Sequence, residues 1–324
     1  MNRRDAITSL LTLVVAGPLV ARAQQTPPVI GYLSSSASAN FPVVAAIGEG
    51  LKEYDFVDGR NVKIEYRWAD GVYDRLPALA AELLGRQPAV IFAGGLPAAL
   101  ALKAATSTVP IVFVVGADPV KLGVVKSLRQ PGGNITGVSQ LYGALGAKRL
   151  ELLRDLVPKT SSVAVITNPK NANAKDHLAD VQAAARAIGW HADVFNVSSA
   201  AEIDAAYAKL SRQRTQTVLV ADDPFFNVQR LQFVTLAARY ATPAIYYASE
   251  FVRDGGLISY GSNLADNYRL AAAYVGKILK GAKPGDLPVL QPTKFELALN
   301  MQTAKALGIK IPNSILLRAD KVIE

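Results

Sequence analysis

The stretch P-I-V-F-V-V-G-A-D-P-V, residues Pro110 to Val120, decides the fold of this chain. Its residues Ile111 to Val115 are β-branched or aromatic without a polar interruption, which is typical of a parallel strand covered by helices on both faces. Gly116 ends the run, and Asp118 follows shortly after it. Because open α/β sheets bind ligands beyond the carboxyl ends of their strands, we expect Asp118 to lie beside a ligand site.

The same pattern recurs in the second half of the chain as T-V-L-V-A-D-D-P-F-F, Thr217 to Phe226. An apolar run again ends in Ala-Asp and then proline. Two sheets are implied, each with an acidic residue at the end of a strand. If these two ends face each other across a cleft, the protein closes on a small molecule.

Strand and helix patterns alternate along the chain, which predicts two mainly parallel sheets with right-handed crossovers. A length of 324 residues fits two domains better than one. Near the end we expect a helix from Leu264 to Leu279, a flexible crossing, and short strands at Phe295 to Leu299 and Ile315 to Leu317. The chain thus visits one lobe and returns to the other. The expected lobes are residues 27–140 with 262–283, and 141–261 with 284–324.

Residues 1–23 have the pattern of a cleavable signal peptide. Arg3 and Arg4 precede an apolar segment from Ala6 to Val20, and Ala21-Arg22-Ala23 forms a small-x-small cleavage site. The apolar segment is shorter than the roughly twenty residues that span a bilayer. We therefore expect export to the periplasm, with the arginine pair leaving the twin-arginine route open.

Composition excludes several classes of protein. The chain has no cysteine, which rules out disulfides, thiolate metal sites, cysteine nucleophiles and a lipid-modified cysteine anchor. The formal net charge is +9. Lysines and arginines are scattered and do not alternate with aromatic residues, so we interpret them as solvated helix faces and expect no nucleic-acid partner.

Few residues could support catalysis. The two histidines, His177 and His191, belong to no metal-binding spacing, and there is no G-x-S-x-G elbow, dinucleotide fingerprint or P-loop. Asp222 and Asp223, with Asp118, could bind a ligand ammonium, cap a helix, or act as general acid and base. We expect no enzyme, no metal and no cofactor. A hydrolase that uses Asp222 and Asp223 stays open as an alternative.

Three other features are candidates for ligand binding. The turn at Ser34 and Ser35 offers hydroxyls and free amides that suit a carboxylate or phosphate, or that simply cap the next helix. Gly94 and Gly95 allow a ligand to approach the backbone closely. Aromatic residues at strand ends suit a flat amine or an amino acid, although each could instead pack on a helix. They are Phe225, Phe226, Tyr246, Tyr247 and Tyr260.

Several longer segments resemble one known family. In chain order they are AGGLPAALALKAAT from Ala93, PIVF and ADPV within the opening stretch, SLRQPGGNITG from Ser127, KRLELL from Lys148, NPKN from Asn168, GGLISYG from Gly255, KILKGAKPGDLPV from Lys277, QPTKFEL from Gln291 and LLRADKVIE at the end. As a set, they resemble the tryptophan/tyrosine-type substrate-binding proteins of ABC transporters. The resemblance runs from Val29 to Glu324.

This resemblance implies a periplasmic-binding-protein fold of the first type, with two Rossmann-like lobes, three hinge crossings and a solute between them. The implied partner is an ABC permease in the inner membrane, and we expect a monomer. A periplasmic sensor for a signalling receptor is an alternative that this sequence does not separate from transport. The solute is expected to be an aromatic or other apolar amino acid or a related compound.

We assign provisional roles to the candidate residues. Asp118 or Asp222 would hold the ammonium of the ligand, Ser34 and Ser35 its carboxylate, and Tyr246 with Phe225 its side chain. The positions that the resemblance carries over to the cleft are Ser34, Ser35, Gly94, Gly95, Asp118, Asn168, Asp222, Tyr246 and Ser262.

Overall fold

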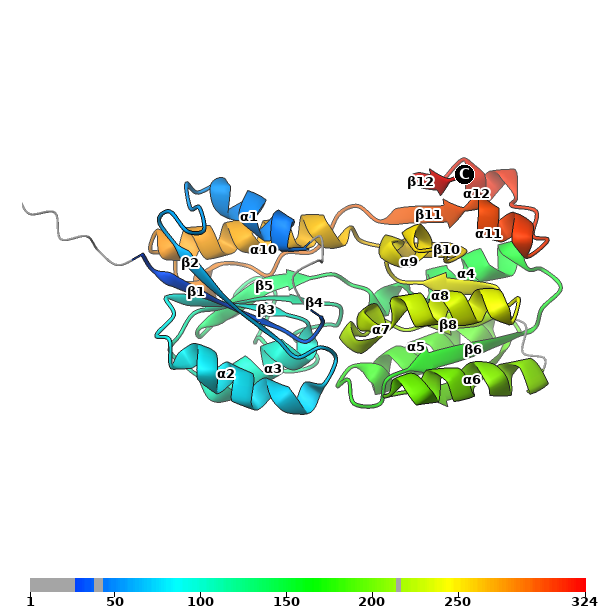
Figure 1. The fold of residues 1–324 in the computed structure, drawn as a ribbon, viewed down its shortest axis with the longest axis horizontal. Helices are drawn as coiled ribbons and strands as arrows, with labels where there is room; N and C mark the ends of the chain where they lie inside the picture. The colour runs from blue at the N-terminus through cyan, green and yellow to red at the C-terminus, as the bar shows by residue number, and fades with distance from the viewer. Residues whose placement is uncertain (1–26, 38–42, 214–216) are drawn as a thin grey trace, which may run out of the picture.

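The computed structural model describes residues 27–37, 43–213 and 217–324. The predicted signal peptide, residues 1–23, lies outside them. The described residues form two α/β lobes that lie side by side (Figure 1). Among the described helices, none is long and apolar enough to cross a membrane.

The first lobe is built on a five-stranded parallel sheet in the order β2-β1-β3-β4-β5. The strand predicted from the opening stretch is β4, and all of its residues are buried. Strand β2 lies at one edge of the sheet. The strands are β1 (Val29–Ser34), β2 (Lys63–Trp68), β3 (Val90–Gly94), β4 (Ile111–Val115) and β5 (Ile135–Ser139).

Helices cover both faces of this sheet, as the uninterrupted apolar strands require. On one face α1 (Val43–Lys52) lies against α10 (Leu264–Leu279), which comes from much later in the chain (Figure 1). On the other face lie α2 (Leu76–Leu84) and α3 (Leu96–Ala105). The short helix η1 (Tyr73–Arg75) precedes α2.

The second lobe is built on a seven-stranded sheet in the order β12-β11-β10-β9-β8-β6-β7. Its neighbouring strands are parallel except for the antiparallel pair β10 and β11. The strands are β6 (Ser162–Thr167), β7 (His191–Asn196), β8 (Val218–Val220), β9 (Ala244–Tyr246), β10 (Ile258–Gly261), β11 (Glu296–Asn300) and β12 (Lys321–Ile323).

Helices again pack on both faces of the second sheet and form two apolar cores with it. They are η2 (Gly143–Leu145), α4 (Gly146–Leu156), α5 (Ala174–Ala187), α6 (Ala200–Gln213), α7 (Pro224–Val228), α8 (Arg230–Arg239), α9 (Ser249–Arg253), α11 (Met301–Ala306) and α12 (Asn313–Leu316).

The expected final strand at Ile315 to Leu317 is wrong. These residues belong to α12 and the turn after it, and the last strand is β12. Pro312 precedes the helix, and Ile315 is its buried residue, whereas the Leu317 residue is 87% exposed. A run of three apolar residues is too short for its periodicity to separate helix from strand.

Within the described residues the chain crosses between the lobes after β5, after β10 and after Leu290. Residues 284–290, which include η3 (Pro284–Asp286), still pack on the first sheet. The Leu290 amide donates to the Gly137 carbonyl at 2.9 Å, and the Thr136 hydroxyl donates to the Leu287 carbonyl at 2.7 Å. The last crossing therefore follows Leu290, rather than residue 283 as the sequence-based boundary had it.

A buried arginine ties two of these crossings together. Arg149 on α4 donates from Nη1 to the Tyr142 carbonyl at 3.0 Å and from Nε to the Tyr260 carbonyl at 2.9 Å. Burial lowers the pKa of Arg149 to about 10, so the guanidinium stays cationic at neutral pH. The ends of β5 and β10 are thus held at a fixed separation.

We predict opposite effects for alanine at two glycines of α1. A Cβ atom at Gly50 would overlap the Arg269 carbonyl oxygen and stand 2.8 Å from the Ala272 Cβ, whereas one at Gly48 would meet nothing within 4 Å. Gly50→Ala should push α10 away and lower the free energy of unfolding by about 1–3 kcal/mol. Gly48→Ala should raise it by about 0.5–1 kcal/mol, because alanine favours the helix. Urea unfolding measures both, and equal effects would contradict the close contact of α1 with α10.

Candidate ligand-binding site

A cavity lies between the lobes, at the carboxyl ends of strands from both sheets. The first lobe contributes aromatic rings and small residues, and the second contributes carboxylate and amide side chains. This is the place where open α/β sheets bind ligands. The two acidic residues of the cavity wall, Asp222 and Asp223, follow β8 and have different surroundings.

Asp223 is buried, and both of its carboxylate oxygens are hydrogen-bonded. Oδ1 accepts from the Asn168 amide at 3.0 Å and from the Phe225 backbone amide at 3.0 Å. Oδ2 accepts from the Asn171 amide at 2.7 Å and from the Tyr73 hydroxyl at 2.8 Å. Burial nevertheless dominates and raises the pKa of Asp223 to about 6. With four donors on two oxygens, Asp223 has little capacity left for a ligand.

The Tyr73 hydrogen bond joins the two lobes. Tyr73 lies in η1 of the first lobe, whereas Asp223 caps the start of α7 in the second. Close packing accompanies this bond, because a Cβ atom at Gly71 would stand 2.9 Å from the Phe225 ring. Gly71 has a φ of 78°, a conformation that glycine adopts without strain. The lobes are therefore in direct contact along this side of the cavity.

Asp222 is also buried, at 8% exposure, but it is not saturated. Its Oδ2 accepts from the Asn173 amide at 3.3 Å, while Oδ1 accepts no hydrogen bond from any described residue. The nearest cationic candidate is His177, whose Nδ1 lies 3.4 Å from Oδ1. Gly116 faces Asp222 from the first lobe, and a Cβ atom there would overlap Oδ2. Asp222 is thus a buried carboxylate with acceptor capacity to spare.

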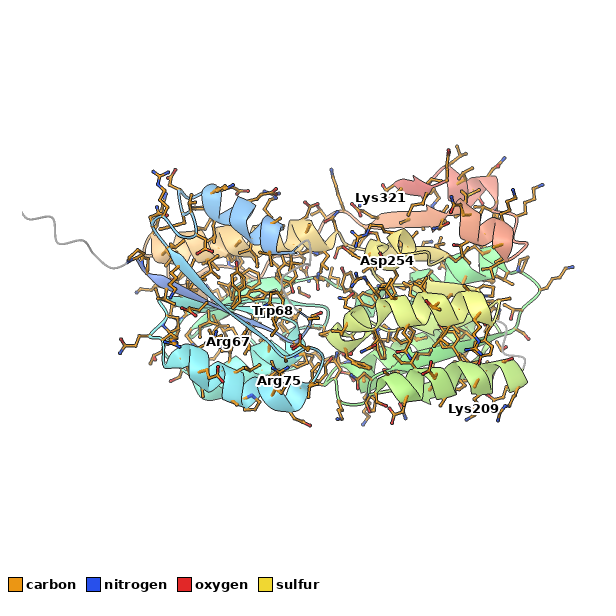
Figure 2. All side chains as sticks on the ribbon, viewed as in Figure 1. Arg67, Trp68, Arg75, Lys209, Asp254 and Lys321 are labelled. Atoms are coloured by element: carbon orange, nitrogen blue, oxygen red, sulfur yellow. The ribbon has the colours of Figure 1, made fainter. Side chains whose placement is uncertain are left out.

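The first-lobe wall of the cavity combines aromatic rings with hydroxyls. A Cβ atom at Gly94 would lie 2.9 Å from the Tyr32 hydroxyl, 3.0 Å from the Tyr268 hydroxyl and 3.3 Å from the Ser34 hydroxyl, so these three groups surround one glycine. Trp68, at the end of β2 (Figure 2), lies 4.9 Å from Tyr32 between ring centroids. The Tyr32 hydroxyl is buried and interacts with the Ser34 and Tyr268 hydroxyls, and burial raises its pKa.

The structure brings six of the sequence-predicted residues to the cavity wall: Ser34, Gly94, Gly95, Asp222, Asp223 and Tyr247. Ser35 instead accepts a hydrogen bond from the Ala98 amide at 2.9 Å and so caps α3, rather than the next helix along the chain as the alternative interpretation had it. Asn168 lies behind the wall and acts through Asp223.

Asp118 does not face the same cavity as Asp222. Its Oδ1 accepts from the backbone amides of Val120 at 2.8 Å and Lys121 at 3.1 Å, and its side chain is exposed. It lines a separate groove between β4 and α5, which we call the side groove; Lys121, Asp176, His177 and Asp180 also line it. Asp118 therefore closes a local turn, as aspartates commonly do.

The aromatic residues predicted from the second half are mostly part of its core. Tyr246 is fully buried and stacks on Phe251 at 4.6 Å, and Phe225 packs on Phe226 at 5.7 Å. Tyr247 lines the cavity instead and donates to the Asp223 carbonyl at 3.0 Å. Successive side chains of an extended segment point to opposite sides, so the neighbour of a core residue faces the cavity.

Ser262 also lies outside the cavity wall. It donates from its hydroxyl to the Gln140 carbonyl at 3.3 Å and accepts from the Asn267 amide at 2.8 Å. It therefore joins two crossings between the lobes. Gln140, at the first of these crossings, does line the cavity.

Sequence reasoning missed most of the side chains that line the cavity. The missed residues include Tyr32, Trp68, Tyr142, Tyr268, Asn173 and Asn227. Tyr66 and Trp68 are two residues apart on β2, so their side chains lie on the same face of the strand. Their rings stack with centroids 6.1 Å apart. This spacing becomes informative only once β2 is known to pair with β1, where Tyr32 stands opposite Tyr66. Among the described residues, no group of three or more metal-binding side chains could hold a metal ion.

Comparison with known proteins gives consistent results. The family model described as "ABC transporter substrate binding protein" matches residues 34–323. A tyrosine-binding protein of Clostridioides difficile (strain R20291) is 27% identical over 263 residues, which cover 81% of this chain and 75% of that protein.

Two solved structures cover nearly the whole chain. One is an ABC domain in complex with L-Trp from Streptococcus pneumonia, which is 26% identical with a TM-score of 0.84 over 92% of this chain and 100% of that chain. The other is a ligand-free, open substrate-binding protein from Clostridium difficile. It is 25% identical, with a TM-score of 0.65 over 91% of this chain and 99% of that chain.

We predict that Asp223 makes the protein less stable as the pH rises. Its pKa is about 6 in the folded state against an ordinary value of 3.8, so the folded state binds the proton more tightly. The stability that this proton contributes is present below about pH 4 and is lost by about pH 6 to 7, a change of about 3 kcal/mol in the free energy of unfolding.

Urea unfolding of the wild type and Asp223→Asn, at several pH values between 4 and 7.5, tests this prediction. The variant lacks the titrating group, so between pH 4 and pH 7.5 the wild type should lose about 3 kcal/mol of unfolding free energy relative to the variant. Parallel curves would show that Asp223 is not the buried, titrating carboxylate that the structure shows.

Proposed function

The chain belongs to the family of ABC transporter substrate-binding proteins, and on this basis we propose that it is the receptor of an importer for an aromatic amino acid. The single observation that carries the choice of ligand is Asp222, a buried carboxylate that lines a cavity walled by aromatic rings and has one oxygen that accepts no hydrogen bond from a described residue. The tyrosine-binding relative and the L-Trp complex support the same class of ligand.

Asp222 is the group that we assign to the ligand ammonium. Asp223 is already saturated by four donors, and Asp118 caps its own turn in the side groove. A buried carboxylate with a free oxygen gains most from a charged donor, since an ionised partner makes the stronger hydrogen bond. The Gly116 backbone packs closely against Asp222 from the first lobe, because a side chain there would overlap the carboxylate.

The ligand carboxylate is assigned to the first lobe. The amino end of α3 faces the cavity at Gly95 and Leu96, and Ser34 and Ser36 lie beside it. The Leu96 amide and the partial positive charge of this helix amino terminus together suit an anion, whereas the Ala98 amide is already bonded to Ser35 and Pro97 has no amide hydrogen. An amino acid would thus place its two charged groups on opposite lobes and hold them together.

The aromatic side chain is assigned to the wall formed by Tyr32, Trp68 and Tyr268. Offset or edge-to-face contacts with a ligand ring add about 0.5–1.5 kcal/mol to the burial of its area. The Tyr32 hydroxyl, which lies in this wall with the Tyr268 hydroxyl, would serve a polar group on that ring. This assignment replaces the earlier one to Tyr246 and Phe225, which pack in the core.

The lobes are arranged as in a closed receptor. The two solved relatives match this chain with nearly equal identity and coverage, yet the L-Trp complex has a TM-score of 0.84 and the ligand-free open structure 0.65. A difference of this kind is expected when lobes of the same fold differ in relative orientation. The hydrogen bond from Tyr73 to Asp223 would form on closure and stabilise it.

The remaining parts of the function follow from the family and from the amino-terminal pattern. We propose that residues 1–23 direct export to the periplasm, where the receptor acts as a monomer and delivers its ligand to an inner-membrane permease. We propose no catalytic step. Binding without turnover is supported by the fixed hydrogen bonds of Asp223, whose two oxygens are taken by four donors and so are not free to exchange a proton with a ligand.

We predict that Asp222→Asn weakens the binding of L-tyrosine or L-tryptophan by about 30-fold to several thousand-fold, as expected when a buried charge partner is removed. Asp118→Asn is the matched control and should bind within about threefold of the wild type, because Asp118 lies outside the cavity. Isothermal titration calorimetry measures both.

A ligand without its amine sharpens this test. The desamino analogue 3-(4-hydroxyphenyl)propionate should bind the wild type weakly, and Asp222→Asn should not weaken it further. An equal loss for L-tyrosine and its desamino analogue would contradict the ammonium role of Asp222. Binding of neither amino acid to the wild type would contradict the proposed function as a whole.

A further inference from the structure

His177 lies on α5, immediately behind the carboxylate that we assign to the ligand. The residue is 3% exposed, and neither ring nitrogen makes a hydrogen bond with a described residue. Its Nδ1 lies 3.4 Å from Asp222 Oδ1, which also accepts no hydrogen bond. Two buried polar groups without partners thus face each other at slightly more than hydrogen-bond distance.

Leaving two buried polar groups without hydrogen bonds lowers the stability of the folded state, since buried polar groups are normally hydrogen-bonded. Such an arrangement indicates a functional role. A shift of a few tenths of an ångström would let Nδ1 donate to Oδ1. Asp222 Oδ2 already accepts from Asn173, so such a bond would give each carboxylate oxygen one protein donor and leave each a second acceptor site for the ligand ammonium. His177 also borders the side groove, so the imidazole stands between the ligand cavity and that groove.

We propose that His177 is a positioning residue for Asp222 that makes ligand affinity depend on pH. The proposal rests on the proposed function, in which Asp222 holds the ligand ammonium. When neutral, the imidazole donates from Nδ1 and orients Asp222 toward the cavity. When protonated, it places a second cation beside Asp222, which competes with the ligand for the same carboxylate.

The charged groups around His177 leave Asp222 as its main electrostatic partner. On α5 itself, Asp176 and Asp180 are polar and open to solvent, and Asp176 is paired with Lys121 of the first lobe at 3.2 Å. Asp118 and Lys121, across the side groove, are exposed. Exposed charges are screened by water, whereas a buried pair is screened far less.

Two further charges act on the same carboxylate. The buried Arg149 of α4 interacts with Asp222 and stays cationic at neutral pH. Asp223, in the same cavity wall, has a pKa raised to about 6 by burial. Protonation of Asp223 would weaken the lobe contact made by Tyr73, so it too would lower affinity in acid. The histidine contribution must therefore be measured as a difference from a variant that keeps Asp223.

Linkage fixes the sign of the effect. Histidine ordinarily changes its charge between pH 5 and 8. If the protonated form weakens binding, affinity falls as the pH falls, and ligand binding must release a proton from His177. The same coupling free energy governs the fall in affinity with pH and the proton release on binding, so the two measurements can be checked against each other.

The test compares L-tyrosine binding by calorimetry at pH 8 and pH 5 in the wild type and three variants. His177→Asn places an amide nitrogen where Nδ1 stands and cannot titrate. His177→Gln places it at the wrong position, and His191→Asn removes the only other histidine, which is exposed and pairs with Asp193 at 3.2 Å.

We expect the wild type and His191→Asn to lose about tenfold more affinity between pH 8 and pH 5 than His177→Asn does. At pH 8, His177→Asn should bind nearly as well as the wild type, whereas His177→Gln should bind about fivefold more weakly, the worth of one hydrogen bond. In two buffers of different ionisation enthalpy, the wild type should release more protons on binding than His177→Asn.

Normal binding with the same pH profile and proton release in the wild type and His177→Asn would overturn the histidine role and leave the proposed function intact. Absence of L-tyrosine and L-tryptophan binding at every pH would overturn both. Thermal unfolding of each variant shows whether it is folded, and if His177→Asn does not fold, His177→Gln, which also cannot titrate, replaces it in the comparison of pH profile and proton release.

Discussion

The structure depends on one buried carboxylate, that of Asp223. Removing a carboxylate from water is costly unless its oxygens are hydrogen-bonded, and Asp223 meets this demand with four donors from separate parts of the chain. Asn168 and Asn171 follow β6, the Phe225 amide begins α7, and Tyr73 comes from the other lobe. A single side chain therefore fixes the loop after β6, starts a helix and joins the two lobes.

The adjacent residues Asp222 and Asp223 have different roles. Asp223 is held in place and closes the structure, whereas Asp222, next to it in sequence, turns toward the cavity with acceptor capacity unused. Two glycines of the first lobe lie opposite. A side chain at Gly116 would overlap Asp222, and a side chain at Gly94 would crowd the Tyr32 and Tyr268 hydroxyls. A ligand with both an ammonium and a carboxylate would then connect the lobes by two charges. Binding of such a ligand would then be coupled to closure of the lobes.

The sequence was informative about the fold because its strands are buried on both faces and so appear as uninterrupted apolar runs. The family and the two-lobe fold of the first periplasmic-binding-protein type are confirmed. The helix Leu264 to Leu279 was predicted with its bounds, whereas Ile315 to Leu317 was taken for a strand because a short apolar run has no clear period. The site was harder to predict. Tyr246 and Tyr247 differ only in which side of an extended segment they face, and Trp68 reaches the cavity through strand pairing that local patterns do not encode.

The most direct test of this account is a crystal structure of residues 24–324 with L-tyrosine bound. The account predicts the ligand ammonium within hydrogen-bond distance of Asp222, its carboxylate at the amino end of α3, its ring against Tyr32 and Trp68, and Asp223 still bonded to Tyr73. A ligand whose amine points away from Asp222, or one bound in the side groove with Asp118, would contradict it.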